Sequence, residues 1–184
     1  MRFSIMAIVA PLFVASCSTI VYQEPASGPR ARVRYVTDSN SVSVLRTYGD
    51  ENCATNETEW MRLRNGMLLN SSPKRLGMPL WNYHDNAAKE IYVEANKPVY
   101  ALFHGGETVG LTTYACATPF SFSFNENTDY EVRFKWATKA CGVSIFQLIK
   151  NPDGVAMQEV ATFTNQATGA NKGCLARLTE KRLY

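Results

Sequence analysis

Short alternations of polar and apolar residues recur along most of the chain after residue 30. The segments 32–36 and 41–45 alternate over most of their length, which is typical of half-buried β-strands. The stretch 37–40 between them is rich in turn-forming residues, so we predict a hairpin with a four-residue connection. The same signals predict further strands at 89–93, 98–103, 108–116, 120–124, 131–136, 142–150 and 155–163.

The spacing of these segments indicates the fold class. Turn-rich stretches such as 125–129 and 151–154 separate the strands, and no strand–helix alternation is visible. About seven to nine short strands in this pattern predict an all-β fold, namely an antiparallel β-sandwich, immunoglobulin-like in general architecture. Residues 47–88 are the least regular part, and we predict an irregular insertion near 50–88, in which 57–63 forms a short helix or a strand and 74–79 an exposed loop.

The N-terminus follows a different pattern. Arg2 supplies a positive charge, residues 5–15 are almost wholly apolar, and small residues precede Cys17. A positive start, a short apolar run and a small-residue cleavage site together predict a secretory signal. The apolar run is too short for a permanent span, because a transmembrane helix needs roughly 20 apolar residues.

The end of this run is more specific. Val14-Ala15-Ser16-Cys17 resembles the lipobox of bacterial lipoproteins, with Val14 where leucine is commonest. The resemblance covers only the first 17 residues. It implies a signal peptide at 1–16, a lipid on Cys17 that holds the protein to a membrane, and, because Ser18 follows, sorting to the outer membrane on its periplasmic side. The alternative is an ordinary cleaved signal peptide with a stray cysteine.

The remainder of the chain fits one domain. Removing residues 1–16 leaves 184 − 16 = 168 residues, enough for one core. Residues 17–30 read as the lipidated cysteine and a flexible polar tether, and 31–184 as a single β-sandwich domain. The formal charge of +3 is mild, and its basic and acidic residues are interspersed, so no nucleic-acid partner is expected.

Four further cysteines predict disulfides, because the periplasm is oxidising. A hairpin centred near residues 127–128 brings Cys116 close to Cys141, which favours a bridge between them. Cys53 and Cys174 then remain as the second pair, and buried free thiols are the alternative. Isolated cysteines without a C-x-x-C pair give little support to a zinc site.

No catalytic signature stands out. His84 and His104 are the only histidines, and we expect each in a loop-like stretch. The chain contains no G-x-S-x-G elbow, H-E-x-x-H motif or phosphate-binding loop, so we predict no enzyme activity, cofactor or metal. A site assembled only by the fold stays possible.

Aromatic residues suggest binding instead. Trp81, Tyr83 and His84 share one predicted loop, and loops carry much of the binding in sandwiches, so these three are the partner-binding candidates. The alternating phenylalanines at 120, 122 and 124 are expected in the core. We therefore expect a non-catalytic binding or scaffolding lipoprotein with an envelope protein or glycan as partner. The alternatives are an inhibitor or immunity lipoprotein that inserts residues 74–85 into a hostile enzyme, and an envelope enzyme.

Overall fold

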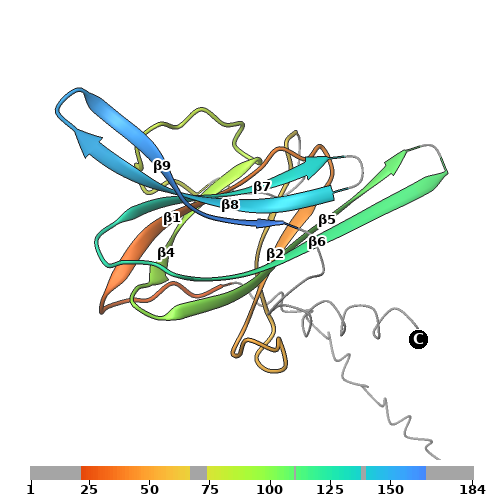
Figure 1. The fold of residues 1–184 in the computed structure, drawn as a ribbon, viewed down its shortest axis with the longest axis horizontal. Coiled ribbons are helices and arrows are strands. Elements are labelled where there is room, and N and C mark those ends of the chain that lie inside the picture. The colour runs from red at the N-terminus through yellow and green to blue at the C-terminus, as the bar shows by residue number, and fades with distance from the viewer. Residues whose placement is uncertain (1–21, 67–73, 110, 138–139, 165–184) are drawn as a thin grey trace, which may run out of the picture.

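Two β-sheets pack face to face in a computed structural model that describes residues 22–66, 74–109, 111–137 and 140–164 (Figure 1). The strands are β1 (Arg30–Thr37), β2 (Ser43–Tyr48), β3 (Thr58–Leu63), β4 (Ala88–Glu94), β5 (Pro98–Val109), β6 (Thr112–Ser123), β7 (Asp129–Ala137), β8 (Ala140–Asn151) and β9 (Gly154–Thr164). One sheet has the order β4-β1-β7-β8-β9 and the other β3-β2-β5-β6. The predicted all-β sandwich is confirmed. Within the described ranges, no helix is long and apolar enough to cross a membrane.

The core forms because alternate residues of each strand point between the sheets. Val33 and Tyr35 of β1 are fully buried there, as is Phe134 of β7. Phe103 of β5 stacks on Phe134 across the two layers, with ring centroids 4.8 Å apart. The core prediction is confirmed for Phe120 and Phe124, which belong to this buried cluster, whereas Phe122 is partly buried and packs against it.

The predicted hairpin between 32–36 and 41–45 is wrong. β1 and β2 lie in different sheets, and β1 instead pairs with β4 antiparallel and with β7 parallel. Alternation shows which face of a strand is buried. It does not show whether the next strand pairs with it in a hairpin or crosses to the other sheet. The predicted separation of 98–103 from 108–116 is also wrong, because β5 runs without a break to Val109 and forms a long hairpin with β6.

The predicted Cys116–Cys141 disulfide is confirmed, but the strands that it connects are not the ones that the prediction assumed. Its sulfurs are 2.05 Å apart and its Cα atoms 6.0 Å apart. Cys116 lies on β6 and Cys141 on β8, which belong to different sheets, so the bridge joins the two layers rather than two arms of one hairpin. Cys53 is also disulfide-bonded. Cys17 and Cys174 lie outside the described residues, so the pairing of Cys53 with Cys174 stays a prediction.

The irregular insertion contains one strand. Residues 57–63, predicted as helix or strand, fall on β3, which pairs with β2 at the edge of the four-stranded sheet. Residues 74–87 have no regular structure and lie on the outer face of the five-stranded sheet, between β3 and β4 in sequence. We call residues 74–87 the strap.

Candidate functional site

The strap follows β1 along the outer face of its sheet. Near the start of β1, Arg32 donates from Nη1 to the carbonyl of Leu76 at 3.3 Å. Near its end, the backbone N–H of Thr37 donates to the carbonyl of Ala87 at 2.9 Å. The strap therefore covers polar side chains of β1, which alternation alone would leave in water.

Arg34 is the centre of this covered region. Its side chain is fully buried and ion-paired with Glu90 of β4 at 2.8 Å and with Glu131 of β7 at 2.9 Å. The strand register places both carboxylates directly beside it. Burying charges is costly unless each is paired and hydrogen-bonded, so removing any one member leaves an uncompensated charge.

The same guanidinium also holds the strap backbone. Arg34 donates to three successive carbonyl oxygens, those of Met78 at 3.0 Å, Pro79 at 2.7 Å and Leu80 at 3.3 Å. Glu90 accepts from the backbone N–H of Met78 at 3.3 Å and also from that of Leu76. Segment 76–80 is therefore fixed from beneath by side chains of the sheet, and the prediction that 74–79 is simply exposed is wrong for Met78, which is 4% exposed.

Leu80 is unusual at this point of the strap. Its φ is 60°, in the left-handed region that residues other than glycine, asparagine and aspartate seldom adopt. Its side chain is also 45% exposed. A strained conformation persists only where its surroundings impose it, and such positions cluster at functional sites. Here the surroundings are the carbonyl contacts to Arg34.

A second set of contacts joins the strap to β7. Tyr83 donates from its hydroxyl to Oε1 of Glu131 at 2.5 Å and accepts from Nη2 of Arg133 at 3.0 Å. Arg133 also pairs with Glu131 through Nε. Burial, and then the hydrogen bond to Glu131, raise the pKa of Tyr83 to about 12, so the hydroxyl stays protonated at neutral pH.

Trp81 packs rather than presenting a free ring. Its indole N–H donates to the carbonyl of Tyr83 at 3.0 Å, and the two rings meet edge to face. The guanidinium of Arg75 lies 4.0 Å from its ring centroid and that of Arg34 lies 5.4 Å from it. Such cation–π contacts fix the ring in place. Leu80, Asn82 and His84 of the strap are exposed near it, as is Arg75 itself.

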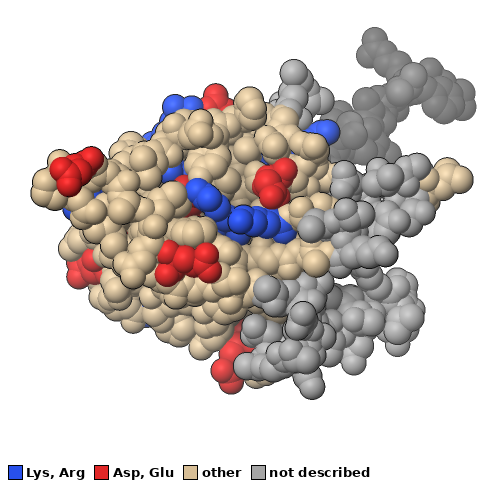
Figure 2. Space-filling view, turned by 45° about the horizontal axis from the view of Figure 1, so that its top comes forward, with Lys and Arg blue, Asp and Glu red and all other residues tan. Residues whose placement is uncertain are grey.

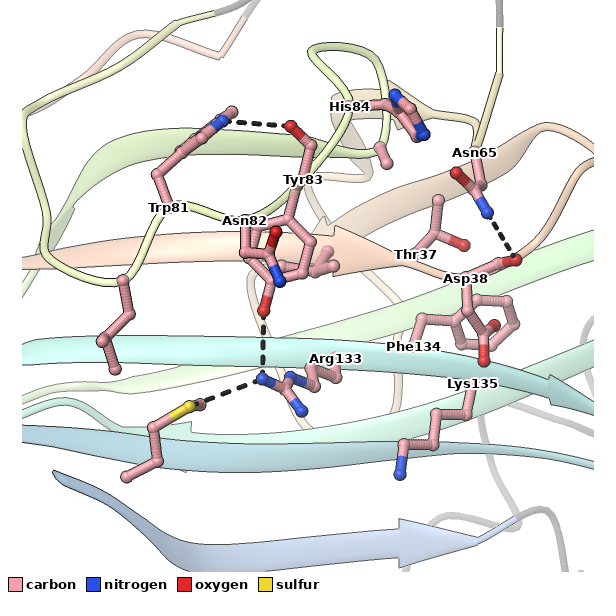
Figure 3. Close-up of a pocket in the computed structure, with 14 residues that line it drawn as sticks. Thr37, Asp38, Asn65, Trp81, Asn82, Tyr83, His84, Arg133, Phe134 and Lys135 are labelled. Atoms are coloured by element: carbon pink, nitrogen blue, oxygen red, sulfur yellow. Dashed lines mark hydrogen bonds between the residues drawn. The ribbon is translucent and has the colours of Figure 1, made fainter.

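These contacts leave a cavity of about 780 Å³ between the strap, the end of β1, and β7. Figure 3 shows the hydroxyl of Tyr83 pointing from the strap toward Arg133, with Asp38 and Lys135 to one side. Figure 2, in which the top of Figure 1 comes forward, shows basic side chains in a band across the middle of the molecule, flanked by acidic ones. The cavity is lined by Val36, Thr37, Asp38, Asn65, Leu80, Trp81, Asn82, Tyr83, His84, Ala87, Arg133, Phe134, Lys135 and Met157. Its size is that of a small-ligand or side-chain site.

The three predicted binding candidates come together here, since Trp81, Tyr83 and His84 all line the cavity. Sequence reasoning missed the residues that hold them, Arg34 and Glu131 above all. A signal was present, because β1 carries arginines at alternate positions and β7 carries acids at alternate positions. Only the register, which the sequence does not show, places these charges side by side.

The two histidines lie in different parts of the fold. His104 was expected in a loop but lies on β5 of the other sheet, away from the cavity that His84 lines. Within the described ranges, no group of three or more His, Cys, Asp or Glu side chains is placed to hold a metal ion. What the arrangement provides is a rigid, hollowed surface with aromatic, amide and charged groups.

A scan of protein-family models, a search of curated proteins and a search of solved structures each found no match for this chain.

Proposed function

We propose that this protein is an outer-membrane-anchored lipoprotein that acts as a non-catalytic binding module of the cell envelope. The cavity and the outer side of the strap form its recognition site. The observation that carries the binding proposal is the burial of Arg34, which binds two carboxylates and three strap carbonyls. Burying a charged side chain to hold the strap is costly, and we take this cost as a sign that the fixed conformation of the strap is needed for binding. Preorganisation reduces the entropy cost of binding.

One observation favours a second candidate, the inhibitor or immunity lipoprotein. Leu80 combines an unfavourable φ with a 45% exposed apolar side chain, and it is held rigidly at the cavity rim. A rigid loop with an exposed apolar anchor is suited to insertion into a pocket of another protein.

Capture of the partner tests the binding site. We expect a cross-linked pull-down with the wild-type chain to recover a discrete envelope component. Asn82→Arg combined with His84→Glu should reduce that recovery at least about tenfold, equivalent to about 1.4 kcal/mol of binding free energy. Both side chains are exposed, so the fold should tolerate the change.

The matched control is Glu126→Arg, an equally exposed charge change in the β6–β7 turn. It should leave recovery unchanged. The binding proposal is contradicted if the cavity variant and the control recover the same component equally well. Recovery of one foreign or envelope enzyme would favour the inhibitor, and recovery of structural envelope components would favour the scaffold.

The lipid anchor has its own test. Cys17→Ser removes the thiol that would take the lipid, so the protein should remain uncleaved or become soluble. Fractionation of envelope membranes, followed by intact-mass measurement, distinguishes these forms. Wild-type-like processing and membrane association of the Cys17→Ser chain would exclude lipidation at this residue.

A further inference from the structure

The chain is fixed to the domain before β1 begins. The ring of Tyr22 lies 4.2 Å from that of Trp60 on β3, and its hydroxyl donates to the carbonyl of Tyr92 at 3.0 Å. Glu24 pairs with Lys74 at 2.6 Å, and Pro29 accepts from the N–H of Ala95 at 2.9 Å. Within the predicted tether at 17–30, Tyr22, Glu24 and Pro29 thus contact the folded domain.

An aromatic groove of about 370 Å³ opens at this attachment point. Four half-buried rings line it, those of Tyr22, Tyr48, Trp60 and Tyr100, together with Pro98 and Val99. The acidic Glu94 on its edge is neutralised by Lys97 at 2.5 Å. Tyrosine and tryptophan rings with an apolar body and a polar tip favour the boundary between water and lipid.

The groove and the cavity lie toward opposite ends of β1. Val93 and Glu94 line the groove and pair with the start of β1 at 30–31, whereas Val36 and Thr37 at its end line the cavity. Seven residue steps along a strand separate these ends by about 23 Å. In Figure 1 the segment before β1 runs along the bottom of the molecule and the yellow-green strap along the top.

We propose that the aromatic groove rests on the bilayer that holds the lipid of Cys17, and that the cavity consequently faces away from the membrane. This inference rests on the proposed lipidation. Five residue steps separate Cys17 from Tyr22, which span at most about 17 Å when fully extended. The tether is thus shorter than the domain, and only surfaces near Tyr22 can reach the lipid headgroups. Of these, the aromatic groove has the chemistry that the headgroup region favours.

Hydroxyl-radical footprinting of the lipidated full-length protein tests this orientation. The protein is reconstituted in vesicles of phosphatidylethanolamine and phosphatidylglycerol and compared with the unlipidated chain of residues 18–184, which carries neither the signal segment nor the lipid, mixed with the same vesicles. Oxidation of Trp60 and Tyr100 should be slower by about threefold or more in the lipidated form, because their rings leave bulk water for the headgroup region. Trp81, half-buried at the opposite end, is the internal control and should react equally in both samples.

A spacer variant provides the matched control. Inserting about twelve Gly/Ser residues between Ser18 and Thr19 adds about 20 Å of reach, so the protection of Trp60 should weaken while the lipid is retained. Three results would overturn the inference in a protein whose lipid is confirmed by mass: unprotected Trp60, equal protection of Trp60 and Trp81, or full protection despite the spacer. A wild-type chain that carries no lipid would instead refute the proposed anchoring itself.

Discussion

Arg34→Met lowers the free energy of unfolding by about 3–5 kcal/mol, because it leaves the buried carboxylate of Glu90 without its cation and removes one of the two cations paired with Glu131. Glu90 and Glu131 are 1% and 0% exposed and have little access to water. The three strap carbonyls lose their shared donor at the same time. Denaturant unfolding followed by circular dichroism measures the loss, and limited proteolysis after Lys74 and Arg75 should show that the strap has been released.

Arg62→Met is the matched control for this experiment. Arg62 also pairs with a carboxylate through two nitrogens, those facing Glu59 at 2.6 and 3.0 Å, but its side chain is 61% exposed. An exposed pair of this kind contributes about 0.2–1 kcal/mol. Arg34→Lys keeps the positive charge but loses the planar guanidinium, so its loss in free energy of unfolding should lie between those of Arg34→Met and Arg62→Met. Equal losses for Arg34→Met and Arg62→Met would contradict the structural role assigned to Arg34.

Removing the bridge between the layers should be nearly as damaging. The double variant Cys116→Ala and Cys141→Ala opens a bridge between residues 25 apart in sequence, for which the chain-entropy model gives about 3.5 kcal/mol. Thermal and denaturant unfolding measure this loss. The exposed Ser121→Ala on the same strand β6 serves as control and should change stability by less than about 0.5 kcal/mol. A double variant as stable as wild type would show that the sheets are held by their apolar core alone.

The sequence was informative where local patterns decide the structure. Alternation located most strands. Of the clean cases, 131–136 lies within β7, and 120–124 covers the end of β6 and the residue after it. The Cys116–Cys141 pair was predicted by assuming an approximate hairpin centred near residues 127–128. The crossing from β1 to β2 was missed because the alternating pattern is the same whether consecutive strands share a sheet or change layer.

The sequence predicted some residues of the candidate site but not the residues that hold them in place. Trp81, Tyr83 and His84 stood out because they share one predicted loop, and loops carry much of the binding in sandwiches. Arg34 did not, because an arginine at a polar position of a strand is ordinarily in water. Its burial depends on a strap that begins 40 residues later (74 − 34 = 40) and on carboxylates from β4 and β7. These are long-range pairings that no local pattern contains.

The two ends of the molecule have different chemistry, which fits membrane attachment at one end and partner recognition at the other. The end near Tyr22 has a short connection to Cys17 and an aromatic groove, and the opposite end carries the rigid strap over its cavity. Anchoring at one end would expose the recognition site to the periplasm at the other. The strap residues Leu80, Asn82 and His84 would then be the first to meet a partner.

The most direct test of this account is photo-cross-linking in the native host, with a photoreactive phenylalanine placed at Asn82 and, in a separate strain, at Glu126. Both positions are exposed, but only Asn82 lines the cavity. The account predicts a discrete covalent adduct from Asn82 and none from Glu126. An adduct from Glu126 alone, or no adduct from either position, would contradict the proposal that the cavity and the strap form the binding site.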